Sequence, residues 1–151
     1  MNKAFVREPD SHGTFCPRCG SQGERVGAEV LALYLTNDDS RSLTPPAHFC
    51  PSPKCAVAYF DGFERFVLAS ALARPAYPKD PAAPLCACFG VTCQDIEQDV
   101  DEGVVTRTKA AVERAKSPEA RCADAAANGR SCVPYLQKYF VDCRQRRSPT
   151  L

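Results

Sequence analysis

The chain has 151 residues, which is enough for one domain or two small ones. Hydrophobic residues make up 44% of it and charged residues 25%, ordinary values for a globular protein that exclude wholesale disorder. The formal net charge is +1 without a long basic stripe, so the charge pattern of a nucleic-acid binder is missing. Ten cysteines beside a single methionine are the unusual feature of the composition.

The redox compartment decides how these cysteines are interpreted. Residues 1–8 contain no apolar run of the length found in secretory signal peptides, so we expect no export. The most apolar run, Val26 to Leu35, contains Glu29 and is too short to span a bilayer. We therefore predict a cytoplasmic protein without membrane insertion, where clustered cysteines are usually metal ligands. A secreted disulfide scaffold is the competing interpretation, but such scaffolds usually have fewer than about 100 residues.

The N-terminal part of the chain alternates between polar and apolar stretches. Residues 1–13 are polar and unpatterned and are predicted to be a flexible tail. Residues 26–35 should form a core segment, although their periodicity does not decide between strand and helix. Residues 37–40 are predicted to be a loop and residues 47–49 a short strand.

Two cysteine pairs in this part have the spacing of a zinc site, C-x2-C-x30-C-x4-C. The first pair brackets a turn that contains proline and is followed by glycine, so both sulfurs can point at one ion. One C-x2-C alone could equally be a redox dithiol. Two pairs make a closed four-cysteine set of the zinc-ribbon kind, and we predict that structural zinc is bound by Cys16, Cys19, Cys50 and Cys55.

A β-hairpin is expected after the second pair. Asp61-Gly62 lies between the aromatic and β-branched runs 56–60 and 63–67, which is a strong hairpin signal. Residues 14–73 are therefore predicted to be a β-rich zinc-binding module. Residues 74–85 contain four prolines and are predicted to be a linker without regular structure.

The second half of the chain has the signals of helices. Thr92 and Asp95 have the spacing of a capping box, which predicts a helix over residues 94–102 that Gly103 ends. A second helix is predicted over residues 106–116.

Three further signals follow in this half. Ser117-Pro118-Glu119 predicts the start of a short third helix. Asn128-Gly129 predicts a turn, and a final helix is predicted from residues 131–134 to about Val141. Residues 144–151 are predicted to be a second flexible tail.

Four cysteines of this half have the spacing C-x-C-x33-C-x9-C. Two thiols one residue apart cannot easily form a disulfide with each other, but they can ligate one iron of a small cluster. Two more thiols, brought back by the helical connection, would hold the other iron of a [2Fe-2S] cluster. Cys132 would lie at a helix N-terminus, where the dipole and free amides stabilise thiolate charge. The predicted cluster ligands of this helical module, residues 86–143, are Cys86, Cys88, Cys122 and Cys132.

This spacing resembles the cluster-binding fold of bacterioferritin-associated ferredoxins. It is more similar to the N-terminal domain of CopZ-type copper chaperones, in which the last two cysteines are far apart. Residues 89–92 also match that family, and the resemblance covers about residues 15–140. It implies zinc at the first quartet, a [2Fe-2S] cluster at the second, and a role in copper trafficking in which the cluster supplies an electron to reduce Cu(II).

The CopZ-type pattern is matched only in part. In that family the domain is joined to a ferredoxin-like copper-transport domain with an M-x-C-x-x-C loop, whereas Met1 is the only methionine here. We therefore expect that a copper-binding chaperone domain or a copper transporter is supplied by another chain.

Cys93 and Cys143 lie outside both quartets. Each is interpreted as a bystander thiol, with an exchange ligand or a point of access for a soft metal such as Cu(I) as the alternative. His48 is two residues from Cys50 and could form a mixed site, but the zinc quartet is complete without it.

The predicted fold class is α+β, a small β-rich zinc-ribbon-like module followed by a helical [2Fe-2S]-binding module. The predicted function is an iron–sulfur and zinc metalloprotein of copper trafficking, a metallochaperone component whose cluster donates electrons. The alternative is a structural double-metal module for protein interaction, or a ferredoxin-like electron carrier without a copper role. We expect no enzyme, because the sequence lacks a Ser/His/Asp set and a phosphate loop, and closed four-ligand sites leave no position for substrate.

Overall fold

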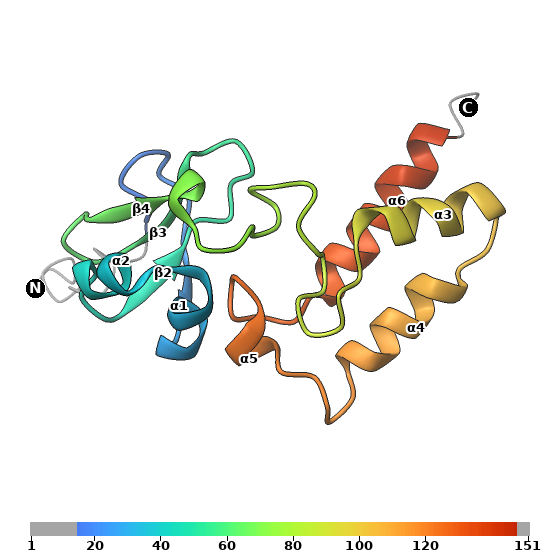
Figure 1. Cartoon of the computed structure of the whole chain (residues 1–151). Coiled ribbons are helices and arrows are strands. Elements are labelled where there is room, and N and C mark those ends of the chain that lie inside the picture. Colours follow the sequence, from blue (N-terminus) through green and yellow to red (C-terminus); the bar gives the residue numbers. More distant parts are fainter. Residues whose placement is uncertain (1–14, 148–151) are drawn as a thin grey trace, which may run out of the picture.

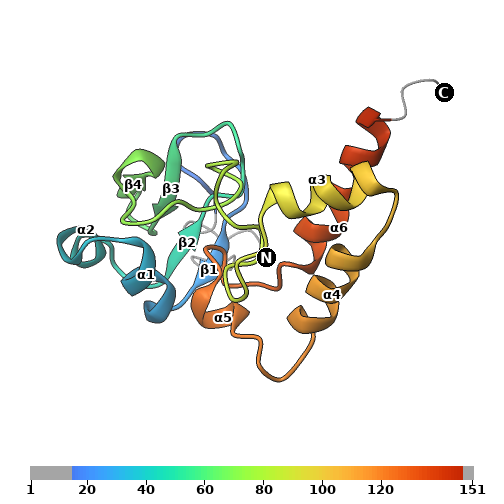
Figure 2. The ribbon, with the colours of Figure 1, turned by 45° about the vertical axis from the view of Figure 1, so that its right-hand side comes forward.

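The computed structural model describes residues 15–147, which form two lobes (Figure 1). One lobe contains a four-stranded antiparallel sheet with α1 and α2, and the other contains α3, α4 and α6. The short helix α5 lies between the lobes, beside α1, and the second view agrees (Figure 2). The predicted α+β fold class is confirmed. The predicted tail of residues 1–13 lies outside the described residues.

The sheet has the strand order β1-β2-β3-β4, so each strand pairs with the next one along the chain. Its strands are β1 (Glu24–Val26), β2 (Ala47–Phe49), β3 (Val57–Phe60) and β4 (Phe66–Leu68). Arg25 pairs with His48 and Phe49 with Tyr59, and every residue of β2 and β3 is buried. The expected strand over residues 47–49 is confirmed.

The hairpin between β3 and β4 is also confirmed, but its loop is longer than an Asp-Gly turn. The buried carboxylate of Asp61 accepts hydrogen bonds from the amides of Phe63 (2.9 Å) and Arg65 (3.1 Å). It also accepts one from the amide of Thr44 at 2.8 Å. Glu64 has a φ of 64°, in the left-handed region. Asp61, the first residue of the five-residue loop 61–65, thus organises this loop through its carboxylate.

Two helices follow β1, where the sequence leaves the structure of residues 26–35 open and predicts a loop at 37–40. α1 (Ala28–Tyr34) buries Val30, Leu31 and Tyr34, which lie on one face at helical spacing. α2 (Asn37–Ser42) occupies the expected loop, so that prediction is wrong. The reason is local, because the hydroxyl of Thr36 accepts a hydrogen bond from the amide of Asp39 and acidic residues fill the first turn.

Three helices form the second lobe and contact one another pairwise. They are α3 (Cys93–Glu102), α4 (Thr106–Ala115) and α6 (Val133–Arg147). The predicted capping box of Thr92 and Asp95 is present, and Gly103 ends α3 in the left-handed conformation. Ile96, Ala111 and Leu136 lie in the core between the helices. α6 continues to Arg147, so residues 144–147 are helical and the expected end near Val141 is wrong.

The buried carboxylate of Asp99 joins α3 to the start of α4. It accepts hydrogen bonds from the amide and hydroxyl of Thr108 at 2.7 and 2.8 Å. It also accepts hydrogen bonds from the amide and guanidinium of Arg107 at 3.2 and 2.9 Å. Val105, at the N-cap of α4, has no side-chain acceptor for the free amides of the first turn. Asp99 therefore caps α4 from the preceding helix.

The short helix expected at Ser117 is absent, because the Ser117 hydroxyl donates to the carbonyl of Arg114 and closes the end of α4. The single turn of α5 (Cys122–Ala125) forms later, and Gly129 makes the expected turn with a φ of 66°. Residues 74–85 contain no helix or strand, as predicted, although Ala76, Ala83 and Leu85 within them are buried.

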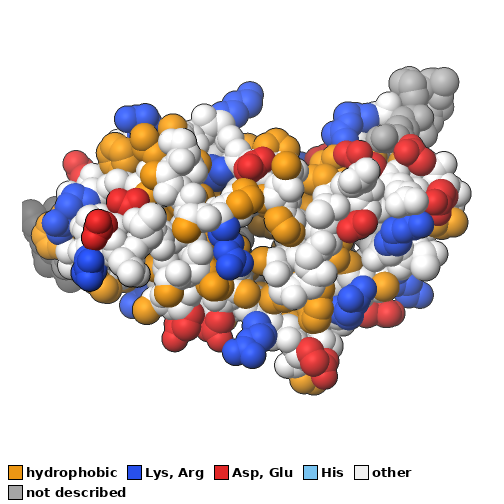
Figure 3. Space-filling model, in the orientation of Figure 1, with side chains coloured by type: hydrophobic (Ala, Val, Ile, Leu, Met, Phe, Trp, Pro, Cys, Tyr) orange, Lys and Arg blue, Asp and Glu red, His pale blue; other side chains and the backbone are white. Residues whose placement is uncertain are grey.

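Within residues 15–147, no helix combines the length and apolar character needed to cross a bilayer. On the face of the molecule in Figure 3, acidic and basic side chains alternate over both lobes.

Candidate metal centres

The four cysteines of the first quartet come together at one edge of the sheet. The sulfurs of Cys16 and Cys55 are 3.8 Å apart, those of Cys19 and Cys50 are 3.6 Å apart, and all four lie within 4.8 Å of one another. A tetrahedral zinc ion with Zn–S bonds of about 2.3 Å requires sulfur separations of about 3.8 Å. The donor set and its spacing therefore fit zinc.

Two tight turns position these sulfurs. The amide of Gly20 donates to the carbonyl of Cys16 at 2.9 Å, and Gly20 has a φ of 78°, which favours glycine. The amide of Cys50 donates to Ala58 at 2.9 Å, so the second turn is anchored on β3. The amide of Val57 lies 3.5 Å from the sulfur of Cys55, where it can stabilise a thiolate.

The four thiols have unequal surroundings. A hydrogen bond with Ser21 lowers the pKa of Cys19 to about 6. Burial raises the pKa of Cys50 to about 12 and also raises the pKa of Cys55. Because a metal ligand must be a thiolate, binding at this site releases protons and weakens as the pH falls.

Lys79 supplies positive charge beside the quartet. Its ammonium group donates to the carbonyls of Ser52 and Cys55, the latter at 3.1 Å, and it lowers the pKa of Cys50 electrostatically. Four thiolates around a divalent ion carry a net negative charge, which this lysine partly offsets. Lys79 belongs to the proline-rich segment, and no spacing in the sequence connects it with the cysteines.

The second quartet is assembled as two sulfur pairs. Cys86 lies beside Cys132 and Cys88 lies beside Cys122, and the second thiol of each pair perturbs the pKa of the first. Among the described residues, the first quartet is the group of donors that all lie within 4.8 Å, so the second is more open. Two irons that take two thiolates each require two such pairs rather than one tetrahedral set.

Cys86 and Cys132 form the buried pair. The turn that contains Phe89 and Gly90 returns the chain so that Cys86 and Val91 form a β-bridge. The interaction with the neighbouring thiol of Cys132, together with the amides of Cys88 and Phe89, lowers the pKa of Cys86 to about 6. The same interaction raises the pKa of Cys132.

Cys88 and Cys122 form the half-buried pair. The amide of Arg121 donates to the sulfur of Cys88 at 3.3 Å. Cys122 begins α5, and the carbonyl of Cys132 accepts the first helical hydrogen bond of α6, from Leu136 at 2.9 Å. Backbone donors thus approach this quartet at several points, and the Arg121 amide has no signature in the sequence.

The remaining candidates lie outside both quartets. Cys93 lies at the start of α3, near the Tyr139 hydroxyl of α6, and Cys143 is fully buried in α6. His48 is buried in β2, where its ring stacks on Phe60 with centroids 5.6 Å apart. It is not part of the four-sulfur group.

Known proteins resemble this chain at two levels. A family model described as a zinc-binding domain, zf_CopZ, matches residues 13–72. The solved X-ray structure of the Archaeoglobus fulgidus CopZ N-terminal domain superposes with a TM-score of 0.66 at 22% identity. That match covers 82% of this chain and 95% of the CopZ chain. No curated protein matches the sequence.

Both the sulfur geometry and the description of the matching family model support zinc binding in this part of the chain. Residues 13–72 are therefore similar to a zinc-binding domain of the CopZ type, and over 82% of its length the chain has a fold like that of the CopZ N-terminal domain.

Proposed function

We propose that this chain is an iron–sulfur and zinc metalloprotein of copper trafficking. The zinc ion is structural, and a [2Fe-2S] cluster donates single electrons to Cu(II). The observation that carries the proposal is the arrangement of the second quartet as two thiol pairs with backbone amides directed at their sulfurs.

The charges around the second quartet suit bound thiolates. The neighbouring Cys132 thiol lowers the pKa of Cys86 and burial raises it, and Arg114 lowers it further by a smaller electrostatic effect. Amide donors near ligand sulfurs and positive charge nearby both stabilise a reduced, more negative centre. When bound, the cluster supplies one-electron redox chemistry at this position.

The two sulfur pairs differ in their access to solvent. Cys86 and Cys132 are buried, whereas Cys88 and Cys122 are half-buried. An electron acceptor can therefore approach the second pair more closely. We assign the side of Cys88 and Cys122 as the side through which Cu(II) or a partner protein receives the electron.

The copper role is supported by the likeness to the CopZ N-terminal domain. In this proposal, a copper-binding domain or transporter on another chain receives the Cu(I). The proposed function requires no catalysis. Both quartets use all their donors on metal, so neither leaves a position for an enzyme substrate.

The ligand assignment is tested by iron and sulfide analysis of anaerobically reconstituted protein, with visible absorption spectra. Cys132→Ala should lose the cluster, whereas Cys93→Ala should keep the wild-type iron content, because Cys93 lies near Tyr139 and outside the quartet. Loss of iron from Cys93→Ala with retention in Cys132→Ala would show that the ligand set is wrong.

The copper role is tested by stoichiometry. Dithionite-reduced, desalted protein is mixed with Cu(II) and a Cu(I) chelator, and Cys88→Ala serves as the control for reduction by free thiols. We expect the wild type to form one additional Cu(I) per cluster, as each cluster loses one electron. Equal Cu(I) yields from wild type and control would favour the structural double-metal module instead.

A further inference from the structure

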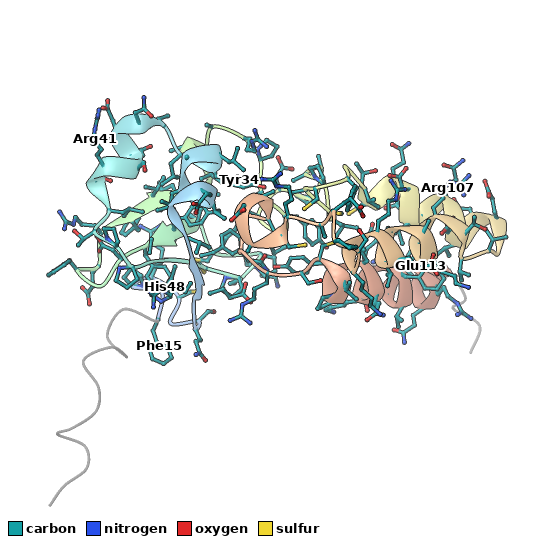
Figure 4. All side chains as sticks on the ribbon, turned by 90° about the horizontal axis from the view of Figure 1, so that it is seen from below. Phe15, Tyr34, Arg41, His48, Arg107 and Glu113 are labelled. Atoms are coloured by element: carbon teal, nitrogen blue, oxygen red, sulfur yellow. The ribbon has the colours of Figure 1, made fainter. Side chains whose placement is uncertain are left out.

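The lobe that contains the sheet, α1, α2 and the first quartet is called the zinc lobe. Two of its tyrosine hydroxyls reach across to the segment that carries Cys122. Tyr34, on α1, donates to the carbonyl of Ala125 at 3.0 Å. Tyr59, on β3, donates to the carbonyl of Ala127 at 2.6 Å. Both tyrosines are buried, and Figure 4 shows Tyr34 on the side of α1 that faces α5. Burial raises the pKa of both phenols, so they remain hydrogen-bond donors near neutral pH.

The segment that they hold has little stability of its own. α5 is four residues long and buries none of them, and so short a helix does not form in isolation. Its internal hydrogen bonds run from the amide of Ala125 to Arg121 (2.8 Å) and from the amide of Ala126 to Cys122 (3.0 Å). Ala125, which Tyr34 holds, is therefore hydrogen-bonded within the turn that contains Cys122, and Ala127, which Tyr59 holds, lies two residues further along the chain.

The zinc lobe also contacts the residues that follow α5 in the chain. Ala127 is part of the hydrophobic core that lies around the sheet and α1. Gly129 lies against β1, where a β-carbon would be in van der Waals contact with the carbonyl oxygen of Arg25, 3.4 Å away. Arg130 lies 3.6 Å from the carboxylate of Glu24, on β1. The position of residues 122–130 is thus set by the zinc lobe, although this segment carries a thiol of the second quartet.

We propose that Tyr34 and Tyr59 are positioning residues of the cluster site. They fix α5, and through it the sulfur of Cys122 and the Arg121 amide that donates to Cys88. This inference rests on the proposed function, which makes Cys122 a cluster ligand. Its consequence is that the second quartet is complete only while the zinc lobe is folded.

The first test measures cluster retention in the full-length protein loaded with zinc and [2Fe-2S]. Tyr34→Phe, Tyr59→Phe and the double variant are compared with Tyr139→Phe, whose hydroxyl bonds to Glu97 of α3 and not to α5. Each of the two tyrosine hydroxyls that hold α5 should slow the release of iron to a chelator by about fivefold. This is the factor that a typical net hydrogen bond contributes.

We expect the double variant to release iron more than tenfold faster than wild type and to show an altered visible circular dichroism spectrum. Tyr139→Phe should retain the wild-type spectrum even where its melting temperature falls. Equal release rates and identical spectra in the double variant and in Tyr139→Phe would overturn the inference.

A second test needs no iron and separates this inference from the proposed function. Hydrogen exchange at the amides of Ala125 and Ala126 is measured in the zinc-loaded, iron-free chain. Tyr59→Phe should raise exchange at both amides by about fivefold, and removal of zinc should abolish their protection. Unchanged exchange in the double variant would refute the inference that Tyr34 and Tyr59 hold α5. A wild-type chain whose α5 is protected in this way but which assembles no cluster would refute only the proposed function.

Discussion

Asp99 offers a sharp test of how the helical lobe is held together. Its carboxylate is fully buried and accepts four hydrogen bonds from Arg107 and Thr108, the second and third residues of α4. In Asp99→Asn, one oxygen can still accept from two donors, but the amide nitrogen then faces the other two. The substitution keeps the volume of the side chain, so its effect reports on hydrogen bonding and charge alone.

The expected loss follows from the two broken contacts. Hydrogen bonds to charged groups contribute about 1.5–3 kcal/mol each, so Asp99→Asn should lower the free energy of unfolding by about 3–6 kcal/mol. A domain's whole stability is about 5–15 kcal/mol. The matched control is Glu102→Gln, which removes a carboxylate that bonds the same Arg107 at 3.1 Å but is 47% exposed. An exposed pair of this kind contributes about 0.2–1 kcal/mol.

Urea unfolding followed by circular dichroism at 222 nm measures both variants under one set of conditions. Full-length protein loaded with metal is used throughout, so that the second lobe keeps its native surroundings. Equal losses in Asp99→Asn and Glu102→Gln would refute the reasoning, because burial would then make no difference to the strength of the interaction.

Three further outcomes are expected. Burial would raise the pKa of the Asp61 and Asp99 carboxyls, but hydrogen bonds from backbone amides lower both below the usual range. The contribution of these two carboxylates to the free energy of unfolding should be full above about pH 5 and lost as the pH falls through their folded-state pKa values. The urea midpoint should therefore drop at acid pH, and it should drop less in Asp99→Asn. Cys55→Ser should unfold the zinc lobe, since structural zinc contributes on the order of 10–16 kcal/mol; a variant without zinc and with wild-type near-UV circular dichroism would contradict this. Gly23→Ala should cost about 1–3 kcal/mol in thermal melts, because its β-carbon would lie 2.5 Å from the ring of Phe60, and an unchanged melt would count against that packing.

Elements whose signals lie close together in the chain are predictable from the sequence. Thr92, Asp95 and Gly103 bound α3 through contacts within one helix, and the structure has the expected capping box and left-handed end. Thr36 and Ser117 show where this reasoning fails. Thr36 caps a helix in a stretch that is polar enough for a loop, whereas Ser117 bonds back to the helix before it instead of starting another.

The candidate sites divide in the same way. Cysteine spacing predicts a zinc quartet, and the structure brings those sulfurs to tetrahedral distances. The contacts that support the sites are not predictable, because they join distant residues without a repeated pattern. The Tyr34 contact spans 91 residues, the Tyr59 contact spans 68, and Lys79 reaches the zinc turn from a segment without regular structure.

The path of the chain through the two lobes has a consequence for biosynthesis. Translation at about 5–20 residues per second needs roughly 4–15 seconds to pass from Cys55 to Cys132. During that interval the zinc lobe can acquire its ion and fold, so the surface formed by Tyr34 and Tyr59 is ready when α5 leaves the ribosome. On the proposed function, in which the second quartet holds a [2Fe-2S] cluster, we expect iron to be inserted last. A cell starved of zinc should therefore accumulate this protein without iron, even where its supply of iron and sulfide is ample.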